Sequence, residues 1–283
     1  MRLLRYQHHE GASGAATGVL MGQEVVPLAA LGDFPQDTAS ILAGGAALRE
    51  ALMAAAAACA TRLPLAGLKL LMPVERPGKV ICIGLNYALH AKEGNNPIPD
   101  YPAVFLRVQS SLIGPDAPML RPGCSTKLDY EAELAVIIGQ GGKNISQADA
   151  MKHVFGYTVV NDVTARDVQM RHQQWDMGKS FDTFCPMGPW IVTADEIDGR
   201  NTRVRCWVNG ELRQDGPTEN MIFDIPTLIE TISRGITLYP GDIIATGTPA
   251  GVGMGLNPPR YIAKGDVIRV EIDGVGHIEN RFV

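Results

Sequence analysis

Residues 128–139 read Leu-Asp-Tyr-Glu-Ala-Glu-Leu-Ala-Val-Ile-Ile-Gly, and this stretch constrains the fold more than any other part of the chain. Glu131 and Glu133 stand two positions apart and lead into an apolar run typical of a β-strand. Side chains two apart in a strand point to the same face, about 6.6–7 Å apart along it. Two carboxylates on one face repel each other unless a positive group lies between them. The stretch therefore predicts a buried strand that begins at a cation site.

A third acid, Asp162, ends a second apolar run at residues 157–162. Three carboxylates without Cys or His at ligand spacing are typical of a hard cation such as Mg²⁺, Mn²⁺ or Ca²⁺. The alternative is a polar strand end with exposed acids, since Glu and Asp are usually surface residues. The alternation by itself leaves both interpretations open.

Composition and charge exclude several classes of function. The chain has 283 residues and a net charge of −5, and it contains no basic run of the kind that binds nucleic acid. Its five cysteines are scattered without zinc-type spacing, which indicates reduced thiols in a cytoplasmic protein. The N-terminus lacks the apolar core of a signal peptide, and the longest apolar run is too short to span a bilayer. We therefore expect a cytoplasmic protein without a membrane or nucleic-acid partner.

The strand and turn pattern predicts two domains, a small one at 1–72 and a larger one at 73–283. Short strand patterns and an Ala-rich helix near 46–62 come first, and then prolines at 64, 73 and 77 indicate a boundary. From residue 79 onward short strands alternate with Gly/Pro turns, and Asn209-Gly210 and Asp273-Gly274 predict hairpins. The pattern favours a mainly β fold with α/β elements, a barrel or folded sheet rather than a βαβ repeat.

His90 and Glu93 form a second candidate group, because residues three apart on a short helix share one face. A carboxylate beside an imidazole orients the ring and raises its basicity, as a general base requires. On spacing alone, however, an ordinary helix surface with a chance His/Glu pair is the better explanation.

Three more polar residues follow Asp162. Arg166 lies four residues later, Gln169 lies one turn further, and Lys179 begins the run Lys-Ser-Phe-Asp-Thr-Phe-Cys-Pro. A cation beside a metal could hold a carboxylate and stabilise an enolate, whereas solvated surface charges are the alternative. The Gly-rich segment 246–255 could bring backbone N–H groups to an anionic ligand, or it could be a flexible turn.

Taken together and in this order, these motifs resemble the fumarylacetoacetate hydrolase family over residues 75–283. The segments that carry the resemblance are Ile-Gly-Leu-Asn-Tyr-Ala-Leu-His at 83–90, Phe-Leu-Arg at 105–107, Leu-Asp-Tyr-Glu-Ala-Glu at 128–133, Asn-Asp-Val-Thr-Ala-Arg-Asp at 161–167, Gly-Lys-Ser-Phe-Asp-Thr-Phe-Cys-Pro at 178–186 and Pro-Gly-Asp-Ile-Ile-Ala-Thr-Gly-Thr-Pro-Ala-Gly-Val-Gly at 240–253. The chain departs from the family pattern at Arg107, where relatives often carry Lys, and at Leu89, where they often carry a polar residue.

The resemblance implies a mixed β-sandwich roll catalytic domain behind a variable N-terminal extension, in a homodimer. It implies Mg²⁺ or Mn²⁺ as the cofactor, with Ca²⁺ able to take its place in crystals. It implies that His90 and Glu93 lie on a lid over the substrate and activate water, and that Lys179 is the active-site lysine. The residues that it assigns to the metal are Glu131, Glu133 and Asp162, and those that it assigns to the substrate are Arg107, Tyr130, Arg166, Gln169 and Thr248.

The resulting hypothesis is a metal-dependent hydrolase that cleaves a C–C bond in a β-diketo acid. Such an enzyme resembles an acylpyruvase or fumarylpyruvate hydrolase, or else a 2-hydroxyhepta-2,4-diene-1,7-dioate isomerase. A decarboxylase or keto–enol isomerase of a 2-oxo dicarboxylic acid, such as oxaloacetate or an aromatic-catabolism intermediate, is the alternative, because both reactions pass through the same enolate. A binding protein with a structural Ca²⁺ is a third reading from a different class.

Overall fold

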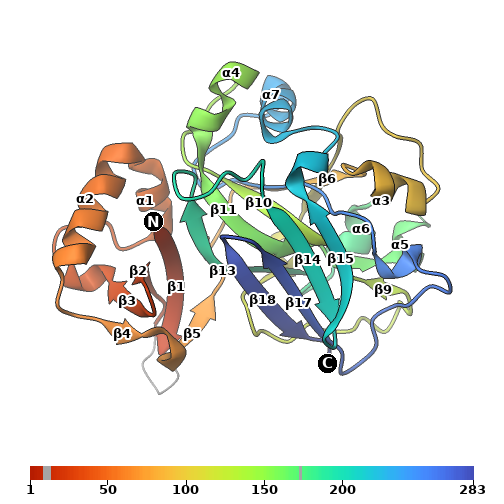
Figure 1. Cartoon of the computed structure of the whole chain (residues 1–283), viewed down its shortest axis with the longest axis horizontal. Coiled ribbons are helices and arrows are strands. Elements are labelled where there is room, and N and C mark those ends of the chain that lie inside the picture. The colour runs from red at the N-terminus through yellow and green to blue at the C-terminus, as the bar shows by residue number, and fades with distance from the viewer. Residues whose placement is uncertain (9–13, 172–173) are drawn as a thin grey trace.

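A large mixed sheet runs through the computed structural model of the chain, which describes residues 1–8, 14–171 and 174–283 (Figure 1). Its strands follow the order β4-β3-β2-β1-β13-β11-β10-β16-β6-β7, with β5 paired to β1 and β8 paired to β13. The bounds of these strands are β1 (Arg2–His8), β2 (Ala16–Met21), β3 (Glu24–Pro27), β4 (Leu63–Pro64), β5 (Leu68–Leu71), β6 (Val80–Gly84), β7 (Ala103–Arg107), β8 (Leu112–Ile113), β10 (Ala132–Ile138), β11 (Val154–Asn161), β13 (Cys185–Thr193) and β16 (Ile243–Ala245). Most neighbours are antiparallel, whereas β16 runs parallel to β6 and β8 runs parallel to β13.

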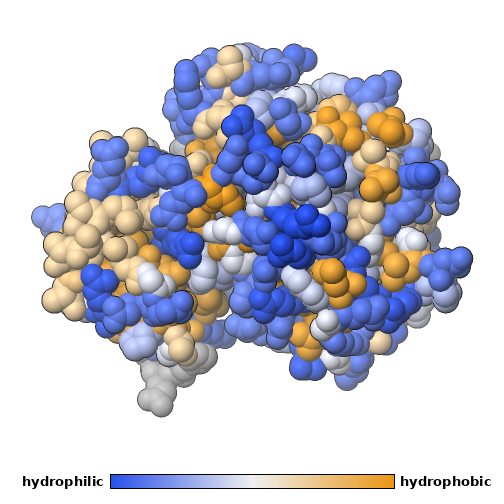
Figure 2. All heavy atoms as spheres, in the orientation of Figure 1, coloured by the Kyte–Doolittle hydropathy of each residue, from blue (hydrophilic) through white to orange (hydrophobic). Residues whose placement is uncertain are grey.

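A second, four-stranded sheet packs against β10 and β11. It has the order β15-β14-β17-β18 and consists of β14 (Arg203–Val208), β15 (Glu211–Pro217), β17 (Val267–Ile272) and β18 (Gly276–Arg281). Asn209 and Gly210 both have positive φ, 52° and 82°, which confirms the tight hairpin predicted there. The outer face of this sheet carries ion pairs such as Arg203 with Asp215, and Figure 2 shows a hydrophilic surface over it.

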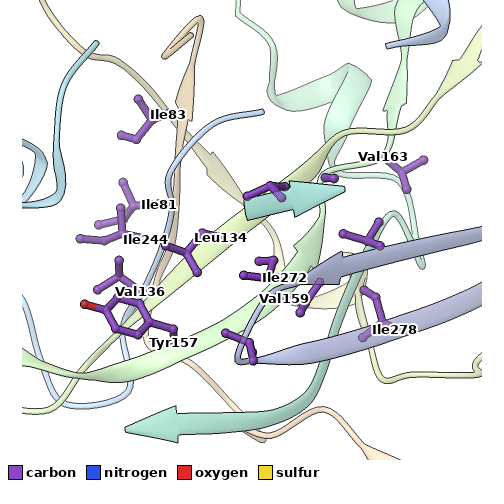
Figure 3. Close-up of a cluster of buried hydrophobic side chains, with 14 of the residues drawn as sticks. Ile81, Ile83, Leu134, Val136, Tyr157, Val159, Val163, Ile244, Ile272 and Ile278 are labelled. Carbon is purple, nitrogen blue, oxygen red and sulfur yellow. The ribbon is translucent and has the colours of Figure 1, made fainter. Parts of the chain in front are cut away.

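Apolar residues cover both faces of the central strands. Leu134 and Val136 of β10 join Tyr157, Ile244 and Ile272 in a core between the two sheets (Figure 3). The alternate residues of β10 belong to a second core on the other face of the large sheet. A strand that is buried on both faces reads as a continuous apolar run, as residues 134–138 do. The mainly β fold class with mixed sheets is therefore confirmed.

The helices are short and lie at the edges of the sheets. Their bounds are α1 (Thr38–Ala43), α2 (Gly45–Ala58), α3 (Ala88–Glu93), α4 (Gln147–Ala150), α5 (Arg166–Gln169), α6 (Asp176–Lys179) and α7 (Ile225–Gly235). A small ladder of β9 (Leu128–Asp129) with β12 (Thr164–Ala165) leads into α5. Among the described residues, no helix combines the length and the apolar character needed to cross a bilayer.

The N-terminal strands continue the large sheet, because β1 pairs with β13. Helices α1 and α2 lie beside β1–β3 in Figure 1, and buried residues of α1 and α2 share a core with Phe155 and Ile191 of the central strands. The domain division at residue 72 stays a prediction.

Candidate metal centre and pocket

Strand pairing brings the three predicted acids together. Ala132 of β10 lies opposite Asn161 of β11, and the backbone N–H of Asp162 donates to the carbonyl of Glu131 over 2.8 Å. Glu131 and Glu133 point to the same face, as their spacing predicts. Carboxylate oxygens of Glu131, Glu133 and Asp162 lie within 4.8 Å of one another, and all three residues are buried.

The electrostatics of this cluster suit a divalent cation. Burial raises the pKa of Glu133 well above its usual range, and the carboxylates of Asp162 and Glu131 raise it further. One backbone group, the N–H of Gly247, donates to Glu133 over 2.9 Å. Buried, mutually repelling oxygens of this kind are what Mg²⁺ and Mn²⁺ prefer as ligands. The residues present therefore fit the metal implied by the sequence.

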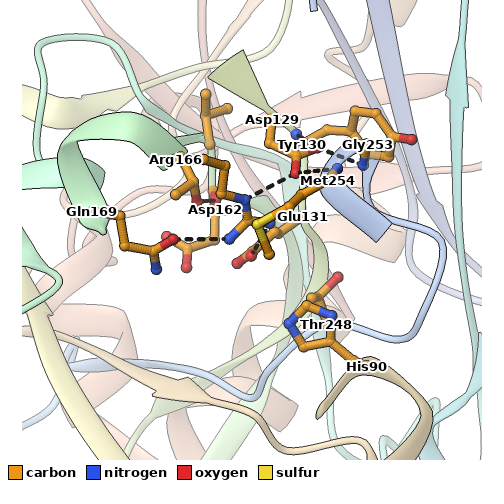
Figure 4. A network of polar contacts seen from close by, with 12 residues as sticks. His90, Asp129, Tyr130, Glu131, Asp162, Arg166, Gln169, Thr248, Gly253 and Met254 are labelled. Carbon is orange, nitrogen blue, oxygen red and sulfur yellow. Dashed lines mark hydrogen bonds and ion pairs between the residues drawn. The ribbon is translucent and has the colours of Figure 1, made fainter. Parts of the chain in front are cut away.

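Two buried cations, Lys179 and Arg166, lie against the acids, and Figure 4 shows Arg166 among its partners. The Nζ of Lys179 is 2.5 Å from one oxygen of Glu131 and 2.5 Å from one of Asp162. Arg166 reaches Glu131 over 2.7 Å and bonds Gln169 Oε1 over 3.1 Å. Although burial alone would raise the pKa of Glu131, Lys179 and Arg166 lower it below its usual value. Glu131 is therefore held as a carboxylate.

Asp129 completes this network and was missed by the sequence analysis. It accepts a bond from Arg166 Nε over 2.9 Å and from the backbone N–H groups of Gly253 and Met254 over 2.7 and 3.0 Å. The signal was present, because Asp129 precedes Glu131 by two positions in the same alternation. The Gly-rich segment 246–255 is thus fixed to the acid cluster rather than being a free turn.

His90 and Glu93 meet as their spacing predicts. The Nδ1 of His90 lies 2.8 Å from one oxygen of Glu93, and the other oxygen accepts the N–H of Gly251 over 2.9 Å. Helix α3 is therefore tied to the Gly-rich segment through Glu93. The His90 side chain is buried and lines the pocket above the acids.

The pocket collects most of the predicted site residues. Seven of them line it, namely His90, Glu131, Glu133, Arg166, Gln169, Lys179 and Thr248. Thr248 donates to the carbonyl of Ala132 over 2.9 Å and accepts from Gln214 over 2.7 Å. The other lining residues were not foreseen and are mostly apolar or backbone-rich: Ile83, Gly84, Leu85, Gly94, Asn96, Met170, Trp175 and Met254.

Arg107 and Tyr130, which the sequence analysis assigned to the substrate, lie outside the pocket lining. The Arg107 side chain is fully buried, and it pairs with Asp162 and donates to the carbonyls of Val163, Lys179 and Phe184. The hydroxyl of Tyr130 donates to the carbonyl of Gly251 over 2.9 Å. These contacts favour a supporting role behind the metal centre, and the assignment to substrate stays a prediction that the geometry does not favour.

Arg107→Met should destabilise the protein by about 3–5 kcal/mol, because it removes a charge from a buried ion pair and leaves backbone carbonyls without donors. The free energy of unfolding in urea measures the effect. Arg205→Met is the matched control, since Arg205 forms its ion pairs at the outer surface and should cost within about 1 kcal/mol. Equal losses in both variants would contradict the supporting role of Arg107.

The fold and the site define an enzyme class: a mixed β fold with three clustered, buried carboxylates that fit a divalent cation, beside a pocket lined by His90 of helix α3. The chain belongs to the fumarylacetoacetate hydrolase family, because the family model for the fumarylacetoacetate hydrolase C-terminal region matches residues 79–283.

Named relatives carry several related activities. A human mitochondrial oxaloacetate tautomerase, FAHD2A, is 46% identical over 253 residues, which cover 88% of this chain and 81% of the relative. The solved fumarylacetoacetate hydrolase from Exiguobacterium antarcticum has a TM-score of 0.86 at 40% identity, and the match covers 100% of this chain and 99% of that one. The maleylpyruvate hydrolase from Sphingobium sp. SYK-6, solved with manganese(II) and pyruvate, has a TM-score of 0.82 at 35% identity with the same coverage.

Proposed function

We propose that this chain is a divalent-metal-dependent enzyme that forms the enolate of a small 2-oxo acid, and that its reaction is the keto–enol tautomerisation of oxaloacetate. The observation that carries the proposal is the Lys179 ammonium between Glu131 and Asp162, on the wall of a pocket that also holds His90. Tautomerisation needs a proton carrier and a stabilised enolate, and the similarity to the human oxaloacetate tautomerase supports this choice.

Glu131, Glu133 and Asp162 would hold the cation. A bound Mg²⁺ or Mn²⁺ supplies a Lewis acid that lowers the energy of negative charge on the 2-oxo group. Lys179 adds a positive charge at the same place: although burial alone would lower its pKa, Asp162 and Glu131 raise it, so the side chain is an ammonium at neutral pH. Arg166 and Gln169 offer N–H donors for the substrate carboxylate, and apolar Ile83 and Trp175 keep water out.

His90 would carry the proton. Its Nδ1 is engaged by Glu93, which leaves Nε2 as the ring nitrogen free to exchange a proton with the ligand. His90 takes a proton from C3 of the keto acid, and the electron pair moves to the 2-oxo oxygen. Return of the proton to that oxygen gives the enol, and the reverse sequence gives the ketone. Glu93 holds the ring in place throughout, because Gly251 fixes its second oxygen.

The decisive experiment follows the decay of enol-oxaloacetate by its ultraviolet absorbance. Protein with Mg²⁺ or Mn²⁺ should speed the decay. Chelation of the metal should lower this catalysed rate at least about 100-fold, because the cation supplies several kcal/mol of charge stabilisation. Re-addition of metal should restore it. A protein that binds metal and leaves the uncatalysed rate unchanged would refute the proposal.

C–C hydrolysis of an acylpyruvate is the second candidate, because the His90–Glu93 pair can also activate water and because the maleylpyruvate hydrolase relative was solved with pyruvate. A panel of acylpyruvates separates the two reactions: hydrolysis releases pyruvate and a free acid in equal amounts, whereas tautomerisation releases neither. The homodimer and the cytoplasmic location stay predictions, which light scattering and fractionation would test.

A further inference from the structure

Strand β7 is the last strand of the large sheet in the part of the chain that the structure describes, and side chains, not a further strand, accept hydrogen bonds at its outer edge. The N–H of Leu106 donates to Oδ1 of Asp176 over 3.1 Å, and the N–H of Val108 donates to Oγ of Ser180 over 3.4 Å. Unpaired edge groups of this kind invite pairing with other chains unless something covers them. Here the covering segment is α6, whose last residue is Lys179.

The same strand contacts this segment from its buried face. Arg107 donates to the backbone carbonyl of Lys179 as well as pairing with Asp162. The Phe105 ring lies 5.0 Å from the Lys179 Nζ and packs edge-on against Trp175 with ring centres 5.7 Å apart. Trp175 in turn fills the space above Gly84, where a Cβ would clash with its ring. Strand β7 therefore contacts this segment both at Trp175, before the lysine, and at the backbone carbonyl of Lys179.

The position of Lys179 matters for the cation as well as for the substrate. Its Nζ contacts Glu131 and Asp162, which are two of the three carboxylates in the metal cluster. A cation held by these carboxylates would compete with the ammonium for their negative charge and would be repelled by it. A lysine held firmly in place therefore weakens cation binding and keeps a positive charge where the enolate forms.

We propose that Asp176 is a positioning residue for Lys179: by binding the free edge of β7 it fixes the ammonium against Glu131 and Asp162. The inference rests on the proposed function for its effect on turnover, and on the geometry alone for its effect on cation affinity. Loosening α6 should let Lys179 move away from the acids. Cation affinity and catalytic turnover should then change in opposite directions, whereas general damage to the site would lower both.

The test compares Asp176→Ala with Asp176→Asn in the full chain. Mn²⁺ affinity by titration calorimetry should rise at least about threefold in Asp176→Ala, because ammonium–cation repulsion falls. The kcat for oxaloacetate tautomerisation should fall by about 10- to 100-fold, as for other supporting partners of a metal site. Asp176→Asn keeps an oxygen acceptor for Leu106 and should behave like the wild type in both measurements. The exposed Asp182 lies three residues past Lys179, and Asp182→Ala should change neither quantity.

Thermal unfolding identifies a variant that fails to fold, and Ser180→Ala then replaces Asp176→Ala, with a smaller shift expected in the same directions. Weaker Mn²⁺ binding together with lower kcat would overturn the inference, and so would unchanged values of both. Tighter Mn²⁺ binding in Asp176→Ala, in a protein whose wild type does not tautomerise oxaloacetate, would uphold the positioning role and refute the proposed function.

Discussion

Glu131→Gln and Glu133→Gln should both remove divalent-cation binding, but only Glu131→Gln should destabilise the metal-free protein. Glu131 is paired with Lys179 and Arg166. Removal of its charge leaves both buried cations without this partner and should lower the free energy of unfolding by about 3–5 kcal/mol. Glu133 accepts a bond from Gly247 and is attracted by Lys179, but burial and repulsion from Asp162 and Glu131 outweigh both and raise its pKa. Glutamine keeps an acceptor there and removes the repulsion, so this variant should equal or exceed the wild type.

The difference between wild type and Glu133→Gln should grow with pH. The pKa of Glu133 is raised in the folded protein, so from about its ordinary pKa of 4.5 upward the folded state binds more protons than the unfolded state. Stability then falls as pH rises toward the folded pKa. The glutamine variant lacks this loss, and its advantage should therefore be larger at neutral pH than near pH 4.5.

Chelator-treated samples unfolded in urea measure the stabilities, and calorimetry with Mn²⁺ measures the affinities. Loss of a residue that only hydrogen-bonds to a metal ligand lowers metal affinity by roughly 10- to 100-fold. Because Glu131 and Glu133 are proposed to bind the metal directly, the Mn²⁺ affinity of both variants should fall by more than this. Wild-type affinity in Glu133→Gln would remove this residue from the proposed ligand set. Destabilisation of Glu133→Gln as large as that of Glu131→Gln would contradict the charge arrangement of the cluster.

Local sequence patterns predicted the parts of the fold that depend on neighbouring residues. The Asn209-Gly210 turn follows from the positive φ that only a few residue types adopt easily. The shared face of Glu131 and Glu133 follows from the period of a strand. Their approach to Asp162 depends on the register of β10 with β11, which no local spacing encodes. The residue types alone left this cluster as one of two interpretations, and the resemblance to a known family assigned all three acids to the metal.

Residues whose environment is set by distant segments were predicted less well. Arg107 was assigned to the substrate through the family resemblance, whereas its partners in the structure, Asp162, Val163 and Phe184, lie far along the chain. Helix α6 was missed because four residues give no periodic pattern, and its position depends on the edge of β7. In both cases the environment of the residue depends on long-range contacts, which bury residue types that usually lie at the surface.

His90→Gln should lower kcat for enol–keto conversion by about 10²- to 10⁴-fold, the range expected for loss of a general base. Glutamine has the length to stay in the pocket but cannot accept and release a proton near neutral pH. Mn²⁺ affinity should stay within about twofold of the wild type, because His90 is not among the clustered acids. His153→Gln is the matched control, since His153 bonds the carbonyl of Gln140 at the surface and lies outside the pocket.

The same variant separates the chemistries that share this site. Tautomerisation and acylpyruvate hydrolysis both need a proton carrier at the His90 position, so both should collapse in His90→Gln. Decarboxylation of oxaloacetate needs only stabilisation of the enolate by the cation and Lys179, so any pyruvate formed by the wild type should still form in the variant. Enol decay and pyruvate release, measured on one sample with Mn²⁺, give both answers. Full enol–keto activity without His90 would move the proton transfer to another group, and Lys179, whose ammonium also lines the pocket, would be the next one to replace.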